Sequence, residues 1–242
     1  MSSALDNLKS QFILNFVEKD RWRYFVSGLG VTLRITLFAV LIGIVLGTLV
    51  AIVRSTGDKL LPGMRKGPGR IFLGIANGLC KIYLTVIRGT PVVIQLMISY
   101  YIIFASSRNG VLIAIIAFGI NSGAYVAEIV RAGIMSVDNG QMEAGRSLGF
   151  TFVQTMAYII IPQAFKNVLP SLANEFIVLL KETSVAGYVA VRDLTKAGDI
   201  VRGTTYSAFM PLIGVALVYL ILVVFFSWLV GKLERRLRAS DH

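Results

Sequence analysis

Long apolar runs, separated by short charged or glycine-rich segments, dominate the pattern of this chain. An apolar α-helix of roughly 20 residues crosses a hydrocarbon core of about 30 Å. The runs predict five such spans, at 29–53, about 83–105, 110–134, 151–182 and about 208–231. The expected fold class is therefore an all-α membrane protein with five transmembrane helices.

The second span is the hardest to place, because 71–106 would exceed about 50 Å as one helix. Two spans hinged near Pro91 would fit that length, but they would put the basic segment 54–70 and the basic C-terminal tail on opposite sides of the membrane. A single span puts both on one side. We therefore expect 71–82 to be a partly interfacial approach and 83–105 to be the span, bent near Pro91.

Basic residues set the expected orientation, because loops rich in lysine and arginine stay in the cytoplasm. The segment 54–70 has five basic residues and one acidic residue, Asp58. The tail after the last apolar run carries Lys232, Arg235, Arg236 and Arg238. We expect a cytoplasmic C-terminus, an external N-terminus and a charge-balanced external loop at 183–206.

Residues 1–28 precede the transmembrane domain, which we expect to cover 29–242. Two interpretations of this segment stay open. Its apolar residues share a helical face and Trp22 and Tyr24 follow, which is typical of an amphipathic helix in the membrane interface. The segment could equally be a partly ordered tail. Within the first span, Gly43 and Gly47 have the spacing of small residues that allow close helix packing.

Composition excludes several classes of protein. Hydrophobic residues make up 55% of the 242 and charged residues 15%, and the mean hydropathy is +0.73, which is unlike a soluble domain. The net charge of +11 does not indicate nucleic-acid binding, because the basic residues flank apolar runs and form no single stripe. One cysteine, Cys80, and one histidine, His242, argue against a disulfide or a metal site. The chain has no phosphate-binding P-loop, so we expect it to hold no nucleotide.

The polar, glycine-punctuated segment at about 135–150 lies between two apolar spans. Asp138 with Gln141, and Thr151 with Gln154, have capping-box spacing at helix starts. Gly149 suits the left-handed conformation that ends many helices. The pattern predicts a short helix, a sharp turn and a new helix, which together form a compact knob at the membrane surface.

This knob carries a recognisable signature. The spacing from Glu143-Ala144-Gly145 through Gly149 to Ile159 and Pro162 resembles the EAA motif of ABC importer permeases. Gly145 replaces the usual second alanine and Ile161 the usual leucine. The resemblance implies the type I importer permease fold and a coupling helix that docks in a groove of an ATPase subunit. The residues implied in coupling are Glu143, Ala144, Gly145, Leu148, Gly149 and Pro162.

Polar groups inside membrane segments are candidates for function, because they are unfavourable unless they face protein or water. Arg88 could hold a carboxylate of a substrate, or it could pair with Glu128 or Glu175 and hold helices together. Arg88-Gly89-Thr90-Pro91 resembles a motif of polar amino-acid permeases of the histidine, glutamine and arginine type. The candidate residues of the substrate path are Arg88, Thr90, Gln95, Asn121, Tyr125, Asn174, Glu175, Thr183 and Ser184.

The resemblance covers nearly the whole chain. It implies the transmembrane subunit of an ATP-driven importer in a bacterial inner or plasma membrane, moving a polar amino acid that an external binding protein delivers. The implied partners are ATPase subunits that carry ATP and Mg, the binding protein, membrane lipid and a second permease chain, as a homodimer or heterodimer. The chain itself is expected to have no catalytic residue, cofactor or metal. The alternative is an ion-coupled amino-acid carrier or channel that works without an ATPase.

Overall fold

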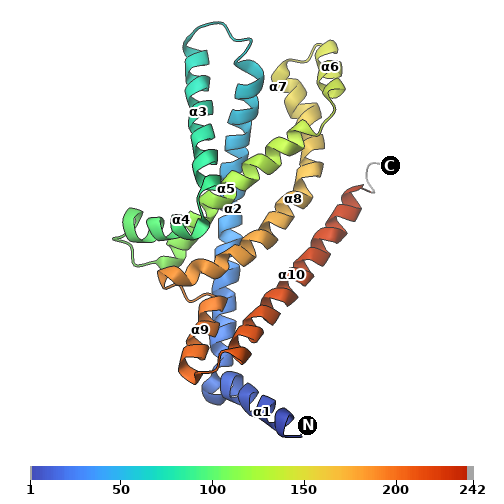
Figure 1. The fold of residues 1–242 in the computed structure, drawn as a ribbon. Coiled ribbons are helices and arrows are strands. Elements are labelled where there is room, and N and C mark those ends of the chain that lie inside the picture. The colour runs from blue at the N-terminus through green and yellow to red at the C-terminus, as the bar shows by residue number, and fades with distance from the viewer. Residues whose placement is uncertain (1, 239–242) are drawn as a thin grey trace. The chain divides into compact units, whose positions relative to one another are not determined.

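The computed structural model describes residues 2–238, so His242 lies outside it. Over that range the chain is helical and has no strand, which confirms the all-α prediction. The α-helices, drawn in Figure 1, are α1 (Ser2–Phe12), α2 (Trp22–Leu60), α3 (Pro68–Gly89), α4 (Val92–Ile98), α5 (Gly110–Met135), α6 (Asn139–Ser147), α7 (Phe152–Thr155), α8 (Ile161–Glu182), α9 (Leu194–Thr205) and α10 (Phe209–Arg238). Short π-helices at Ile13–Val17, Ser99–Ile103 and Met156–Ile160 and 3₁₀-helices at Glu18–Asp20 and Thr183–Val189 complete the elements.

Four of the described helices are long and apolar enough to cross a membrane, namely α2, α3, α5 and α10. The predictions for the third and fifth spans lie close to α5 and α10. The first span, predicted at 29–53, is part of a longer helix of 39 residues. Trp22 to Gly28 therefore belong to α2 and not to a separate N-terminal segment, and Arg54 belongs to α2 and not to a loop.

The predicted second span at 83–105 is wrong. The helix that can cross the membrane is α3, while Val92–Ile103 is a shorter apolar helix that reaches only about 18 Å at 1.5 Å per residue. Pro68 opens α3, where its missing N–H is harmless. Thr90 ends it with φ −123° and ψ 146°, since a residue before proline avoids the helical region. This part of the chain therefore still supplies one helix that can cross the membrane, as predicted, but at 68–89.

The predicted fourth span forms one helical run from α7 through Met156–Ile160 to α8. The π-helical segment ends two residues before Pro162, whose ring nitrogen cannot donate the regular hydrogen bond. Pro170 lies inside α8 and does not end the helix. With 22 residues, α8 is long enough for the fifth crossing, but it is more polar than the other four.

The predicted external loop at 183–206 is also wrong, because it is folded into the 3₁₀-helix Thr183–Val189 and α9. Asp193 begins α9 by accepting hydrogen bonds from the backbone N–H groups of Thr195 and Lys196. Such a cap satisfies donors that a helix start leaves without partners. Leu194, Ala197 and Val201 then form the buried face of the helix.

The helices gather in two compact units, each built from three chain segments. The first unit contains the chain up to Ala39, Val92–Phe118 and Ile177–Trp228. Its apolar core includes Phe25, Leu194, Val201 and Val215. Within it, a Cβ on Gly28 would lie 2.7 Å from the Asp193 carbonyl oxygen, so only glycine allows this contact between α2 and α9.

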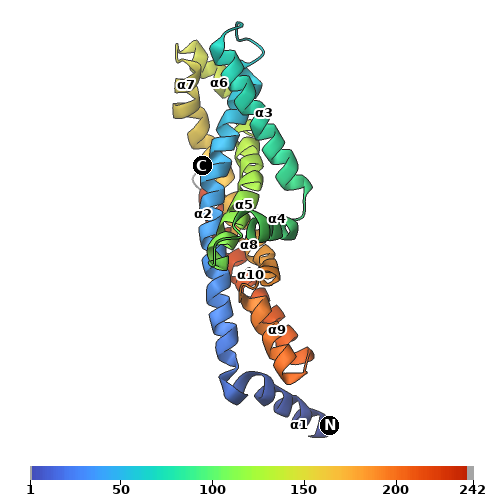
Figure 2. The same cartoon turned by 90° about the vertical axis from the view of Figure 1, so that its left-hand side faces the viewer.

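The second unit contains Val40–Pro91, Gly119–Phe176 and the segment from Leu229. Here the predicted close packing at Gly43 and Gly47 is confirmed. A Cβ on Gly43 would lie 2.7 Å from the Ser122 hydroxyl, and one on Gly47 would lie 2.6 Å from the Gly123 carbonyl oxygen. In this unit the turn between α2 and α3 lies at the same end as α6 (Figures 1 and 2).

The Gly47 contact generates a stability prediction. We expect Gly47→Ala to destabilise the protein by about 1–3 kcal/mol, because a methyl group there overlaps backbone of α5. Gly30→Ala is the matched control in the same helix, since a Cβ on Gly30 meets nothing within 4 Å. It should leave stability unchanged or raise it by up to about 1 kcal/mol. Thermal unfolding in detergent measures both, and equal melting temperatures for the two variants would contradict the packing argument.

Candidate functional site

The knob predicted at 135–150 is built around α6. Asp138 caps the helix by accepting from the Gly140 N–H at 2.7 Å. The predicted capping box with Gln141 is wrong, because the Gln141 side-chain oxygen instead accepts from Gln163 on α8 at 3.4 Å. The Gln141 side chain thus contacts a neighbouring helix instead of the cap. It ties the start of α6 to α8.

The C-terminus of α6 has the geometry that the glycine predicts. Gly149 has φ +87°, a conformation that side chains other than glycine rarely adopt. The Phe150 N–H donates to the Gly145 carbonyl at 3.2 Å, and the Gly149 N–H donates to the Arg146 carbonyl at 3.1 Å. These two bonds form a Schellman motif, which satisfies the last carbonyls of the helix.

The next helix starts two residues later with the predicted capping box. The Thr151 hydroxyl accepts from the Gln154 N–H at 3.3 Å, and the Gln154 side chain accepts from the Thr151 N–H at 2.8 Å. Two well-satisfied helix ends therefore fix the turn between α6 and α7. The knob is a rigid corner and not a loose connector.

The inner face of α6 explains the glycine in place of alanine. Gly145 is buried, and a Cβ there would lie 2.5 Å from the Thr155 methyl group and 3.0 Å from Ile159. Glu143 and Ala144 are exposed on the outside of the helix. Leu148 is 76% exposed.

Further apolar side chains lie near α6 on the surface, among them Val153 and Tyr158. Pro162 is exposed at the start of α8. Exposed apolar side chains beside a carboxylate are suited to contact with another protein.

Arg88 makes an ion pair with Glu128, with 3.4 Å between guanidinium nitrogen and carboxylate oxygen. Of the two partners that the sequence left open, the structure thus brings Glu128 to Arg88. The guanidinium also lies 5.9 Å from the ring centroid of Tyr125. The Arg88 side chain is 46% exposed and that of Glu128 33%, so the pair lies at the surface of its unit, between α3 and α5.

The ion pair continues toward the end of α2. Glu128 and Arg131 pair at 3.6 Å, as the sequence predicts. Arg131 in turn pairs with Asp58 at 3.7 Å, and Asp58 with Arg54 at 3.3 Å. Asp58 was not among the predicted site residues. Its signal in the sequence is that it is the one acidic residue in a basic segment.

Glu175 is 7% exposed and accepts a hydrogen bond from the Ser122 hydroxyl at 2.9 Å. The bond links α8 to α5 inside the second unit. Asn121, beside Ser122, is also buried, whereas Asn174 is exposed. Spacing along one helix could place Asn121 and Ser122 together, but it could not show that Glu175 meets them.

The remaining predicted path residues lie in different surroundings. Thr90 is exposed and bonds to the Val86 carbonyl of its own helix. Gln95 and Thr183 belong to the first unit, where Thr183 is buried and bonds to the Leu180 carbonyl. These local bonds do not test whether the residues line a substrate path, so that role stays a prediction.

Ser184, also in the first unit, lines a cavity of ≈ 430 Å³ together with the charged residues of α9. Lys196 and Arg202 both donate to Asp199 there, at 2.8 and 3.0 Å. These hydrogen bonds lower the pKa of the Asp199 carboxyl. The carboxylate therefore stays ionised and paired over the neutral range, which makes it a structural anion of α9.

Among the residues that the structure describes, no cluster of three or more histidine, cysteine, aspartate or glutamate side chains could hold a metal ion.

Residues 67–239 match the protein family described as the binding-protein-dependent transport system inner membrane component. The chain is 36% identical over 220 residues to the putative glutamine transport system permease protein GlnP of Rickettsia bellii, covering 90% of this chain and 94% of that protein. It is 33% identical to the arginine transport system permease protein ArtQ of Bacillus subtilis, again covering 90% and 94%.

Solved structures agree with these sequence relatives. A crystal structure of an amino acid ABC transporter with histidines matches with a TM-score of 0.77 and 41% identity, covering 88% of this chain and 94% of that one. The MetNI methionine ABC transporter, in an inward-facing conformation, matches with a TM-score of 0.75 at 21% identity, covering 92% and 99%. At that identity the second likeness shows the fold alone.

The left-handed turn generates the prediction for this site. Replacing Gly149 by alanine should destabilise the corner by about 1–2 kcal/mol, because a Cβ in this conformation meets the backbone. Hydrogen exchange at the Phe150 amide, which bonds to Gly145, should then accelerate by about 5- to 30-fold. Gly74→Ala is the control: a Cβ meets no neighbouring atom within 4 Å at either glycine, but Gly74 lies inside α3 and has no positive φ. Unchanged exchange in Gly149→Ala would show that the turn tolerates a side chain.

Proposed function

This chain belongs to the inner membrane components of binding-protein-dependent transport systems, and on that premise we propose that it imports a polar amino acid. It is a permease subunit of an ABC importer, with the all-α type I importer permease fold. The substrate class follows the relatives, whose names specify glutamine and arginine transport. Family membership argues against the alternative hypothesis of an ion-coupled carrier or channel that works without an ATPase.

The observation that carries the proposal is the exposed corner of α6. ATP hydrolysis on a separate subunit can move this chain only through a rigid contact surface. The Schellman turn after α6 and the capping box before α7 supply that rigidity. Leu148, Glu143 and Ala144 supply an exposed face for docking.

The proposed orientation follows from counting crossings. The turn between α2 and α3 is separated from α6 by two spans, α3 and α5, so both lie on one side of the membrane. Two more spans, α8 and α10, return the C-terminus to that side, and α2 alone puts the N-terminus on the other. The basic residues around that turn, Lys59, Arg65, Lys66 and Arg70, make it the cytoplasmic side. An ATPase docked on α6 then lies in the cytoplasm.

The assembly is proposed to contain a second permease chain, of this or of a related sequence, and an external binding protein. Five spans enclose little space, so the path is proposed to form between two chains. The Arg88–Glu128 pair supports this, because it lies at the surface of its unit, where exposure of charge to lipid would be unfavourable. Facing a path, the Arg88 guanidinium can hold a substrate carboxylate by paired hydrogen bonds.

The coupling role can be tested by truncating the exposed leucine of the knob. We expect Leu148→Ala to lower stimulated ATP hydrolysis and uptake together by about tenfold, as truncation of an interface anchor does. The measurement is made on the permease reconstituted in liposomes with its ATPase subunit and binding protein. Leu79→Ala is the matched control, because Leu79 is 62% exposed on α3 and far from α6 in sequence. Loss of activity in both variants alike, or in neither, would argue against docking at α6.

A charge exchange separates the two interpretations of Arg88. Arg88→Ala should lower uptake by at least about tenfold, since a hydrogen bond to a charged group contributes about 1.5–3 kcal/mol. The double variant Arg88→Glu with Glu128→Arg restores an ion pair between α3 and α5, but it reverses the charge offered to a substrate. Arg131 then loses Glu128 and keeps Asp58. We expect the double variant to assemble with the ATPase and to have low uptake. Full recovery of uptake would mean that the pair only holds helices together.

A further inference from the structure

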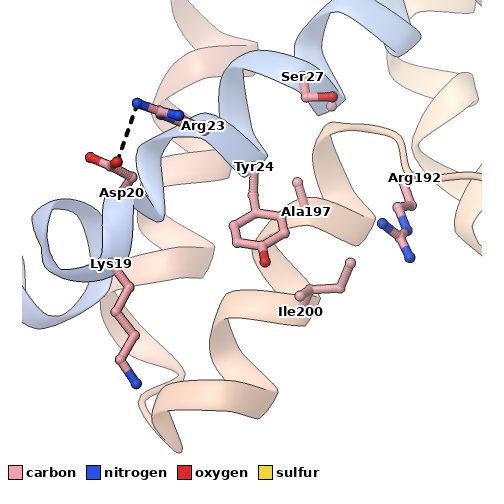
Figure 3. Close-up of a pocket in the computed structure, with 9 residues that line it drawn as sticks. Lys19, Asp20, Arg23, Tyr24, Ser27, Arg192, Ala197 and Ile200 are labelled. Carbon is pink, nitrogen blue, oxygen red and sulfur yellow. Dashed lines mark ion pairs between the residues drawn. The ribbon is translucent and has the colours of Figure 1, made fainter.

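A cavity of ≈ 410 Å³ lies in the first unit, between the start of α2 and α9. Three basic residues line it, Lys19, Arg23 and Arg192. Its apolar side consists of the Tyr24 ring, Ala197 and Ile200. Figure 3 shows Tyr24 projecting from α2 toward α9, with Lys19 on one side and Arg192 on the other. None of these residues takes part in the knob or in the Arg88 cluster.

The charge of this cavity is unbalanced. Asp20 is the one acidic residue of its lining, and it is already engaged by Arg23 at 3.2 Å. Within residues 2–238, Lys19 and Arg192 have no hydrogen bond or ion pair through their charged groups. Two cations beside a small concave surface create a positive potential that attracts an anion.

The backbone at this point is also unusual. Lys19 and Asp20 both have φ of 55°, a left-handed conformation that side chains other than glycine rarely adopt. Two such residues in succession are unfavourable, and strain of this kind gathers at ligand-binding positions. Here it forms the corner between Glu18–Asp20 and α2, from which the Lys19 side chain extends.

Neighbouring side chains place the cavity at the level of lipid headgroups. Trp22 and Tyr24 are exposed at the start of α2, and Phe12, Ile13 and Val17 are exposed on the preceding helices. Exposed aromatic and aliphatic groups beside arginine and lysine are typical of the membrane interface. The helical form of Ser2–Phe12 and Ile13–Val17 fits the interfacial interpretation of this segment.

We infer that this cavity binds the headgroup of an anionic phospholipid from the leaflet at the N-terminal end of α2. The phosphate lies against Arg192, and the lipid's upper chain lies along the apolar side formed by Tyr24 and Ile200, on the side toward Lys19. A helix or strand of another protein does not enter a space of this size, whereas a phosphoglycerol headgroup does. The inference concerns a lipid and not the imported substrate, so it stands apart from the transport proposal.

The test is a binding titration on the whole chain purified in an uncharged detergent. Fluorescently labelled phosphatidylglycerol is compared with phosphatidylcholine carrying the same label and the same acyl chains. We expect tighter binding of phosphatidylglycerol. Arg192→Gln should weaken it by at least about tenfold, the effect of one charge-assisted hydrogen bond, without changing the melting temperature. Lys19→Gly should weaken it as well, while relieving the left-handed backbone.

Lys9→Gln is the matched control, because Lys9 is an exposed cation of the same unit that does not line the cavity. The affinity of the Lys9→Gln variant for phosphatidylglycerol should stay within about twofold of that of the unsubstituted chain, since the substitution removes a charge outside the cavity. Equal binding of the two lipids, or an equal loss in Lys9→Gln and Arg192→Gln, would overturn the inference. Displacement of the lipid by free glycerol 1-phosphate, or by an acidic peptide, at equal concentration would also overturn it, because the site would then recognise any anion.

Discussion

Close approach between helices, made possible by residues without large side chains, is the constraint on which the rest of this structure depends. Inside a bilayer, apolar surface gains little by moving from lipid to protein, so helices associate through tight packing and a few polar contacts. Gly43 and Gly47 bring α2 against α5 at distances that a single methyl group would prevent. Gly28 does the same for α2 and α9.

That close packing determines where charged groups can meet. With α2, α3 and α5 held together, Arg88, Glu128, Arg131 and Asp58 form one chain of ion pairs between 3.4 and 3.7 Å. Each charge that would be unfavourable against lipid has an opposite charge beside it. The same packing places Ser122 beside the buried carboxylate of Glu175. The pairing of these polar groups thus depends on close helix packing, and it also stabilises that packing.

At the ends of the helices, local chemistry takes over from packing. The corner after α6 is fixed by backbone hydrogen bonds and one left-handed glycine, and the start of α7 by a capping box. Such features lie within a few residues of one another in sequence, and they fix the corner between α6 and α7. A partner that docks on α6, as we propose, would contact a helix whose two ends are both held by hydrogen bonds.

The sequence by itself determined most of the features that depend on residues close together along the chain, such as helix spans, caps and turns. Apolar runs predicted α5 almost to the residue and the start of α10, and glycine and capping residues predicted the corner at Gly149. The spacing of the knob also identified the family. Predictions failed where two neighbouring apolar segments could each supply one span, as at 71–106, where the span proved to be α3. They also failed where a helix is polar enough to resemble a loop, as with α9.

Only the tertiary structure decided which helices pack together and which residues along them lie side by side. Arg88 had two possible partners because spacing along one helix carries no information on the rotation and offset of another. Packing of α3 on α5 selected Glu128. Gln141 left its predicted cap for Gln163 for the same reason, as a side-chain bond between helices replaced a local one. Contacts along a chain follow from helical geometry, whereas contacts between helices follow from the fit of whole surfaces, which no single stretch of sequence contains.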